Sequence, residues 1–267
     1  MDLKAKHILL TGASGGIGSA LALALAEQGA NLLMVGRRET MLNELKASLP
    51  RPSEHQFLVI DLLAAEGMSE LDQTCKQWRT EGRGIDIVIN NAGVNTFAFL
   101  SQRDAKSIES EVGLNVITPV LLTQKAIQWI RRPGIVLNIG STFGAIGYPG
   151  YSVYSATKAA LYRFSEAMNR ELEGTEIKVL FIAPRATQTA SNDVRVKDMN
   201  QALGNKTDTP EWVAQQVITT LTKEKPVTWL GWPEKLFVRI NNLLPRVVSA
   251  AIRKQHATIT DFVSKHS

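Results

Sequence analysis

The sequence predicts an α/β fold, built as a doubly wound parallel sheet with helices on both faces and a C-terminal amphipathic helical extension. Short apolar runs typical of strands alternate with longer stretches whose apolar residues recur at helical spacing. A glycine-rich turn joins the first run to the first helical stretch, and beyond residue 230 the alternation gives way to a basic amphipathic pattern. Such alternation is typical of βαβ units, whose strands are parallel and covered on both faces.

Seven strands and several helices follow in order along the chain. Strands are expected at 7–12, 31–36, 56–62, 85–93, 134–141, 178–184 and 226–230. Helical patterns include 17–28, 67–80, 105–131 and 153–173. The 267 residues, 44% of them hydrophobic, suffice for one sizeable core. We expect a main domain over 1–230, followed by a helical extension over 231–267.

Composition excludes several classes of protein. The single Cys75 forms no internal disulfide and no cluster has metal-ligand spacing, so we expect a metal-free protein of the reducing cytoplasm. No signal peptide or membrane-spanning run is expected. The net charge of +5 lies mostly in the tail, where six Lys or Arg residues stand against two acidic ones from residue 231 onward. No nucleic-acid-binding motif accompanies this charge.

The stretch "TGASGGIG" at 11–18 holds four glycines in eight positions. Glycine weakens the ends of strands and helices, so local stability does not explain why this turn has so many residues without side chains. At the first strand-to-helix turn of a parallel sheet, such backbone can approach the pyrophosphate of a dinucleotide, as in Rossmann-type folds. The residues fit both T-G-x-x-x-G-x-G and T-G-x-x-G-x-x-G, and a ligand-free turn is the alternative. The candidate phosphate-binding residues are Gly12, Ser14, Gly16, Ile17 and Gly18.

The end of the second strand indicates which dinucleotide binds. A carboxylate there would accept hydrogen bonds from the adenosine ribose of NAD(H), whereas "VGRR" supplies Arg37 and Arg38. Their guanidinium groups suit a 2′-phosphate, to which Ser14 can add a hydroxyl. Two solvated arginines are the alternative, but cations are unfavourable at a helix N-terminus unless an anion binds there. The sequence therefore favours NADP(H) over NAD(H).

Four further motifs follow in order. They are "NNAG" at 90–93, Asn115 in "GLNVITP", Ser141 at the end of "NIGS", and Tyr154 with Lys158 in "YSATK". With the glycine turn, they resemble the short-chain dehydrogenase/reductase family in its short, single-domain form, over about residues 5–230. The resemblance favours T-G-x-x-x-G-x-G for the glycine turn. Taken singly, each residue has an ordinary structural explanation. Tyr154 and Lys158 could be a surface pair, Ser141 an N-cap and Asn115 a solvated amide.

The chemistry follows from Tyr154 and Lys158, which lie four residues apart and share one helix face. The ammonium is expected to lower the pKa of the phenol. Tyr154 would then protonate the oxygen of a carbonyl that receives hydride, or take the proton of an alcohol, while Ser141 hydrogen-bonds that oxygen. The resemblance implies that Asn115 supports a water in a proton relay and that Lys158 also holds the nicotinamide ribose. It implies an NADP(H)-dependent oxidoreductase that interconverts a carbonyl and an alcohol.

The resemblance adds further cofactor contacts. It implies contacts with the adenine and with the nicotinamide half of the cofactor from Asp61, Leu62, Asn91, Ala92, Gly93, Pro184, Thr187 and Thr189. The sequence departs from the family at Arg185, where glycine is usual. Arg185 would crowd the nicotinamide, turn outward or meet a substrate anion. Residues 188–206 resemble the mobile segment that commonly covers the substrate.

The substrate is expected to be a small-molecule carbonyl or alcohol. Apolar loop residues near the expected pocket hint that it is lipophilic, although such residues more often serve packing; they are Phe97, Phe99, Phe143, Ile146 and Tyr148. A second function class stays open, a catalytically impaired NADP(H)-binding regulatory or scaffold protein. Arg185 and the tail are the features that keep it open.

Two features of the sequence indicate what the protein binds: a pair of long helices and the C-terminal tail. Family members often pair through the helices expected at 105–131 and 153–173, so a homodimer or homotetramer is expected. The tail has apolar residues at helical spacing, beside cations and after Trp229 and Trp232: Leu236, Phe237, Ile240, Leu243, Leu244, Val247, Val248 and Ala251. We expect Pro245 to split it into two short helices. The pattern predicts peripheral membrane contact through 233–254, with core packing, a pocket cover or a subunit contact as alternatives.

Overall fold

The computed structural model describes residues 1–189 and 194–264, and within these a parallel sheet of seven strands forms the centre of the molecule. The strand order is β3-β2-β1-β4-β5-β6-β7. The strands are β1 His7–Thr11, β2 Asn31–Gly36, β3 Gln56–Val59, β4 Ile87–Asn90, β5 Gly134–Ile139, β6 Ile177–Ala183 and β7 Val227–Trp229. All seven predicted strands are present and every neighbouring pair is parallel, so the predicted fold class is confirmed.

Helices join the strands and extend the chain beyond them. They are α1 Gly16–Glu27, α2 Glu39–Ser48, α3 Ala65–Thr80, α4 Ala105–Val112, α5 Thr118–Trp129, α6 Ser152–Glu171, α7 Val194–Ala202, α8 Pro210–Lys223, α9 Glu234–Leu243 and α10 Pro245–Ser264. Short 3-10 turns lie at Pro52–Glu54, Leu100–Gln102 and Thr142–Gly144. No helix in the described ranges is long and apolar enough to span a membrane.

One predicted helix is interrupted. The stretch 105–131 was expected to be a single helix, but a π-helical turn at Gly113–Ile117 separates α4 from α5. The physical reason is Pro119, which has no N–H to donate to the carbonyl four residues earlier, that of Asn115. π-Turns inside helices often mark functional sites, and this one carries Asn115.

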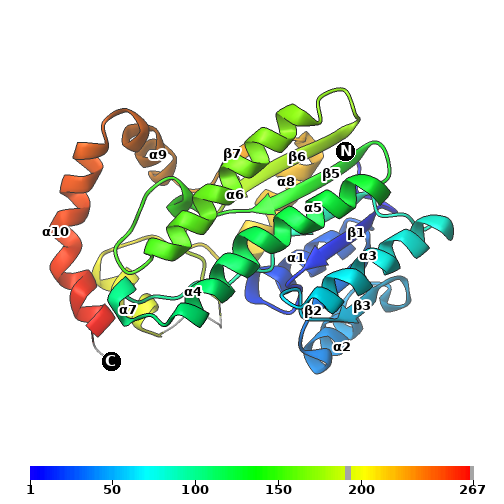
Figure 1. Cartoon of the computed structure of the whole chain (residues 1–267), viewed down its shortest axis with the longest axis horizontal. Coiled ribbons are helices and arrows are strands. Elements are labelled where there is room, and N and C mark those ends of the chain that lie inside the picture. Colours follow the sequence, from blue (N-terminus) through cyan, green and yellow to red (C-terminus); the bar gives the residue numbers. More distant parts are fainter. Residues whose placement is uncertain (190–193, 265–267) are drawn as a thin grey trace.

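The core lies on both faces of the sheet. Helices α1 and α8 cover one face, while α3, α5 and α6 cover the other (Figure 1). Successive strand residues therefore belong to different apolar clusters: Leu10 packs on the α1 side and Leu9 on the α3 side. Both faces of these strands are buried, which explains their nearly continuous apolar runs.

The strand order creates the crevice in which a ligand is expected. The chain passes from β1 outward to β2 and β3, then returns to pair β4 on the other side of β1. In such sheets, ligands bind outside the carboxyl ends of the strands at this point of reversal. The glycine turn follows β1 and the NNAG motif follows β4, so both lie at the crevice.

The tail forms two helices that lie at one end of the molecule (Figure 1). The predicted split is confirmed, because α9 ends at Leu243 and α10 begins at Pro245. The second helix is not short, since it continues for 20 residues to Ser264. Its distal half packs against α7, where Ile259 and Val263 join a separate apolar cluster. Residues 265–267 of the predicted extension lie outside the described range.

Candidate active site

The glycine turn is closely packed. Gly12 has φ +65°, and a Cβ added to it would lie 2.8 Å from the Cα of Ala92. A Cβ on Gly18 would lie 2.1 Å from the carbonyl oxygen of Gly12. Helix α1 begins at this turn with no side-chain cap at Gly15, so its first N–H groups are not used by a capping side chain. These features fit the pyrophosphate of a dinucleotide.

The NNAG motif holds the glycine turn in place. The Asn91 side-chain amide donates to the carbonyl oxygens of Thr11, at 3.0 Å, and Gly12, at 3.1 Å. The Thr11 hydroxyl accepts from the N–H groups of Asn91 and Ala92, both at 3.0 Å. Thr11 is buried and was not among the predicted site residues, although its place before the glycines was the available signal. The two motifs therefore form one unit across β1 and β4.

Residues expected at the adenosine end gather at the carboxyl ends of β1 and β2. Arg38 donates through Nη2 to the carbonyl oxygen of Ser14 at 3.2 Å. The Ser14 hydroxyl lies 3.2 Å from the position that a Cβ would take on Gly36, the last residue of β2. Arg37 and Arg38 are both exposed. The Arg38 guanidinium and the Ser14 hydroxyl thus border one solvent-accessible corner, beside the exposed Arg37, which fits a phosphate monoester.

The predicted adenine contacts lie beside this corner. The N–H of Ile60 donates to the carbonyl oxygen of Gly36 at 3.0 Å and so fixes the end of β3 next to β2. The Asp61 carboxylate accepts from the N–H of Leu63 at 3.0 Å, and the Leu62 carbonyl accepts from the Thr118 hydroxyl at 3.4 Å. The turn after β3 therefore stands at the same edge of the sheet as the glycine turn.

Three of the four predicted catalytic residues meet at the carboxyl end of β5. Ser141 lies two residues beyond the end of β5, and its side chain is close enough to that of Tyr154, near the start of α6, to lower the Tyr154 pKa. Lys158 lies one helical turn further on, with its Nζ 5.7 Å from the centre of the Tyr154 ring. The Lys158 ammonium donates to the carbonyl oxygen of Ile139 at 3.0 Å, which holds the side chain against β5. A donor, an orienting hydroxyl and a cation are thus side by side.

The electrostatics of this group differ from the expectation. Burial raises the pKa of Tyr154 to about 12, with the nearby Ser141 hydroxyl lowering it and the Glu111 carboxylate raising it. Burial lowers the pKa of Lys158 to about 8, against the opposing effect of Glu111. The expectation that the ammonium makes the phenol more acidic is therefore wrong for the protein alone. Desolvation dominates because Lys158 is buried and Tyr154 is partly buried among aromatic side chains.

Asn115 joins the π-turn to α6 and to the NNAG loop. Its side-chain oxygen accepts from the N–H of Val94 at 2.9 Å. Its side-chain nitrogen donates to the Val94 carbonyl at 2.8 Å and to the Thr157 hydroxyl at 3.1 Å. Thr157 directly precedes Lys158, so the buried amide fixes the helix that carries Tyr154 and Lys158. In this structure, the Asn115 side chain therefore has a positioning role.

A buried ion pair lies behind the catalytic group. Glu111 is fully buried and its Oε2 lies 2.5 Å from Nη1 of Arg103, which is also buried. Glu111 Oε1 and Arg103 Nε have no hydrogen-bond partner in the described structure. Glu111 affects the pKa of both Tyr154 and Lys158, so its charge acts on the site. Nothing in the sequence distinguishes these two residues from the charged face of an exposed helix.

Arg185 is held by a carboxylate. Its Nε lies 2.9 Å from Oδ2 of Asp208 and its Nη2 lies 2.6 Å from Oδ1, a bidentate pair. Asp208 also accepts, through its carbonyl, from the N–H of Gln188 at 2.8 Å. Arg185 thus ties together the two ends of the segment between β6 and α8. This ion pair with Asp208 was not among the three predicted orientations of the Arg185 side chain.

The other predicted residues after β6 lie close to the site. Pro184 accepts, through its carbonyl, from the N–H of Thr142 at 3.0 Å, directly beyond Ser141. Thr187 is buried, and its hydroxyl donates to the Arg185 carbonyl at 3.1 Å. Thr189 lies against Gly16 of the glycine turn. The expected covering segment contains α7, and its residues 190–193 lie outside the described range.

Aromatic side chains surround Tyr154. The Phe143 ring lies 4.9 Å from that of Tyr148, 5.2 Å from that of Tyr151 and 6.4 Å from that of Tyr154. Phe97 and Phe99 belong to the same cluster. Three of the five predicted pocket residues, Phe143, Ile146 and Tyr148, also line a cavity of about 690 Å³ between the 143–149 loop, α6 and α10. Tyr151 was missed because it follows a loop glycine in no periodic pattern.

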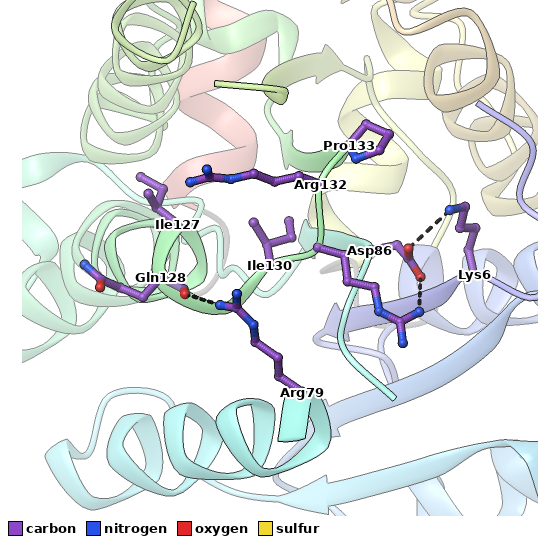
Figure 2. Close-up of a pocket in the computed structure, with 9 residues that line it drawn as sticks. Lys6, Arg79, Asp86, Ile127, Gln128, Ile130, Arg132 and Pro133 are labelled. Carbon is purple, nitrogen blue, oxygen red and sulfur yellow. Dashed lines mark hydrogen bonds and ion pairs between the residues drawn. The ribbon is translucent and has the colours of Figure 1, made fainter. Parts of the chain in front are cut away.

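A second cavity, of about 430 Å³, lies at the opposite edge of the sheet (Figure 2). Its residues precede the strands: Lys6 comes before β1, Asp86 before β4 and Pro133 before β5. Lys6 pairs with Asp86 at 3.2 Å, and Arg79 donates to the Gln128 carbonyl at 2.6 Å. Because this cavity lies at the amino ends of the strands, away from the glycine turn and Tyr154, it is not part of the candidate site.

Comparison with known proteins gives one consistent result. The profile of the short chain dehydrogenase family matches residues 6–200. An NADP-dependent 3-hydroxy acid dehydrogenase of Schizosaccharomyces pombe is 29% identical over 237 residues, covering 84% of this chain and 90% of that protein. A 3-ketodihydrosphingosine reductase of Bos taurus is 26% identical, covering 82% of this chain and 69% of that protein.

Solved structures agree with these sequence relatives. The crystal structure of a short-chain dehydrogenase from Streptomyces avermitilis is similar to this one with a TM-score of 0.76 and 26% identity, covering 95% of this chain and 97% of the other. The family profile spans well over half of the chain, and the motifs described above lie within it. The chain therefore belongs to the short-chain dehydrogenase family of oxidoreductases.

Proposed function

We propose that this protein is an NADP(H)-dependent oxidoreductase that interconverts a carbonyl and an alcohol by hydride transfer, with Tyr154 as the acid/base. The observation that carries the proposal is the grouping of the Tyr154 and Lys158 side chains, 5.7 Å apart from ring centre to Nζ, with Ser141 close enough to Tyr154 to lower its pKa. This group stands at the same edge of the sheet as the glycine turn. A proton donor and a dinucleotide site at one crevice support hydride chemistry.

The chain's own residues account for the proton transfer. When bound, the dinucleotide supplies hydride to the carbonyl carbon or accepts it from the alcohol. The Tyr154 hydroxyl gives its proton to the carbonyl oxygen in reduction and takes it back in oxidation, while Ser141 orients that oxygen. A pKa of about 12 keeps Tyr154 protonated at neutral pH, as reduction requires. Oxidation requires the phenolate, which burial of the Tyr154 hydroxyl disfavours at neutral pH.

The cofactor would be held along the crevice. Gly12, Gly16, Ile17 and Gly18 would bind the pyrophosphate at the start of α1. The remaining proposed contacts with the adenosine and nicotinamide halves are Ser14, Arg37, Arg38, Asp61, Leu62, Asn91, Ala92, Gly93, Tyr154, Lys158, Pro184, Thr187 and Thr189. The free and buried Cys75 suits the reducing cytoplasm, in which we place the enzyme.

The proposed substrate is a lipophilic small-molecule carbonyl or alcohol. The aromatic rings of Phe143 and Tyr151 beside Tyr154 support an apolar substrate. The names of two relatives give a hydroxy acid and a keto compound as their substrates. A screen of ketones, aldehydes and alcohols that follows NADPH absorbance tests the function, and activity on at least one apolar compound is expected. The alternative, an impaired regulator, gains no support from Arg185, because Asp208 binds that side chain.

Cofactor preference is a prediction from the arginine corner. NADPH should bind at least about tenfold more tightly than NADH, since losing the charge-assisted phosphate contacts costs about 1.5–3 kcal/mol. Replacing both arginines, Arg37→Asp with Arg38→Ala, should narrow or reverse the difference in Kd, measured by fluorescence titration. A Lys223→Ala, Lys225→Ala variant changes two exposed cations elsewhere and serves as the control. Equal Kd values for the two cofactors in the unaltered protein would contradict the prediction.

Oligomerisation is a prediction from an exposed face of α5 and α6. Ile117 and Leu121 are 52% and 40% exposed and stand one helical turn apart, and the small Ala156 and Ala160 are exposed on α6. Small and apolar side chains on adjacent helices suit a four-helix contact across a two-fold axis. We expect a homodimer or homotetramer by light scattering at micromolar concentration. The Leu121→Glu variant should shift the protein toward monomer, whereas the control variant Leu100→Glu should not. Finding monomer alone in the unaltered protein would contradict the prediction.

A further inference from the structure

Exposed large apolar side chains are concentrated from just before α9 to the first turn of α10. The described residues include 16 exposed side chains of this kind, and six of them fall between positions 232 and 247. We call these six the apolar tip: Trp232, Leu236, Phe237, Leu243, Leu244 and Val247. Leu243 is 80% exposed and Trp232 is 69% exposed. Apolar groups gathered in this way usually mark an interaction site.

The apolar tip is held firmly from its inner side. Val238 of α9 and Val248 of α10 are both buried. The Asn241 side chain donates to the Ala145 carbonyl at 2.8 Å, and the Tyr148 hydroxyl donates to Oε1 of Gln255 at 3.3 Å. These bonds attach both helices to the 143–149 loop. The inner sides of both helices therefore contact the rest of the chain, and the apolar tip faces water.

The spacing within α9 shows that the exposed side is a continuous stripe. Leu236, Ile240 and Leu243 are separated by four and three residues, so they share one helix face. Val238 points to the opposite side and is buried. The amphipathic pattern predicted from the sequence is thus present, but its wider apolar face is turned outward. The pocket-cover alternative applies to Ile259 and Val263 of distal α10, which are buried over the aromatic cluster.

Cations accompany the apolar tip. Lys235 and Arg239 lie along α9, and Arg246 lies in the first turn of α10; all three are exposed. Between residues 231 and 254 the sequence has five Lys or Arg residues and one acidic residue, Glu234. Long basic side chains can keep their charges in a lipid headgroup layer while their stems follow apolar groups. Tryptophan also favours the boundary between water and hydrocarbon.

We propose that the apolar tip docks on an anionic membrane surface. The apolar side chains enter the boundary between headgroups and acyl chains, and the cations contact lipid phosphates. A second copy of the chain fits this face less well, because a two-fold contact would bring the same cations of both copies together. The proposed contact is peripheral, and no described helix is both long and apolar enough to cross a bilayer.

Vesicle co-sedimentation of the full chain tests the proposal. The protein should sediment with phosphatidylglycerol/phosphatidylcholine vesicles at low ionic strength, bind less as salt rises, and bind weakly to phosphatidylcholine alone. The variant Trp232→Ser with Leu243→Ser should lower the partition coefficient by about tenfold or more. Its matched control, Trp212→Ser with Leu100→Ser, removes the same exposed side chains elsewhere and should bind normally.

A series of variants that lack selected positive charges measures the electrostatic contribution to vesicle binding. Replacing Lys235, Arg239 and Arg246 by Gln should remove most of the salt dependence, whereas Gln at Lys106, Lys223 and Lys225 should not. These point variants are preferable to deleting 233–267, because a deletion would also remove Ile259 and Val263 from their cluster. The readout is binding, so failure of the proposed enzymatic function would leave this test unaffected.

Three results would overturn the proposal. The first is no sedimentation with anionic vesicles at low ionic strength. The second is equal loss of binding in the Trp232/Leu243 variant and in its Trp212/Leu100 control. The third is a Trp232/Leu243 variant that lowers the mass found by light scattering without lowering vesicle binding, which would identify the tip as a subunit contact. Circular dichroism of each variant checks that it is folded.

Discussion

The Tyr154→Phe variant is expected to lose hydride transfer by about 10²–10⁴-fold or more while binding NADPH almost as tightly as the unaltered protein. The substitution removes the proposed proton-donating hydroxyl and leaves a ring of nearly the same shape beside Phe143 and Tyr151. Packing and the dinucleotide site are therefore kept, and the proton donor is lost. Turnover by NADPH absorbance and Kd by fluorescence titration measure the two effects separately.

Two further variants make this result specific. Tyr162→Phe removes a hydroxyl from the same helix, where the ring packs on Phe181 and Trp229 away from Ser141, and turnover should be unchanged. Lys158→Ala should lower both turnover and NADPH affinity, because the proposed role of Lys158 includes a cofactor contact. Normal turnover of Tyr154→Phe would show that another group supplies the proton.

The second large effect is expected at the buried ion pair. Glu111→Ala should lower the free energy of unfolding by about 3–5 kcal/mol, because it leaves the Arg103 guanidinium buried without its counter-ion. Replacing both residues, Arg103→Met with Glu111→Leu, should recover most of this loss, since no charge then remains buried. Chemical denaturation measures each change. Glu166→Ala, which breaks exposed ion pairs on α6, is the control and should change stability little.

Glu111→Gln distinguishes an electrostatic role from a purely structural one. Glu111 raises the pKa of Tyr154, so removing its charge should lower that pKa. Alcohol oxidation needs the phenolate, and its rate rises with pH as Tyr154 loses its proton. The rising limb of the pH–rate profile should therefore move to lower pH in the variant. If the Glu111→Gln variant is slower but the rising limb of its pH–rate profile has not moved, Glu111 only supports the structure.

Several features could be predicted because their causes are local in the chain. Strand and helix periodicity, the glycine turn after β1 and the spacing of Tyr154 and Lys158 each depend on a few neighbouring residues. Proline chemistry is equally local, and the break at Pro245 was predicted from it. The interruption before Pro119 has the same cause but was missed, because apolar periodicity continues through it.

The sequence by itself determined the parallel α/β sheet, its glycine turn and the order of the proposed site residues, because periodicity and backbone requirements are properties of short segments. Only the tertiary structure decided the partners of Arg185 and Glu111, the direction of the Tyr154 pKa and the outward face of α9. Burial and ion pairing depend on segments far apart in the chain, and a helical stripe has the same spacing whether it faces the core or water.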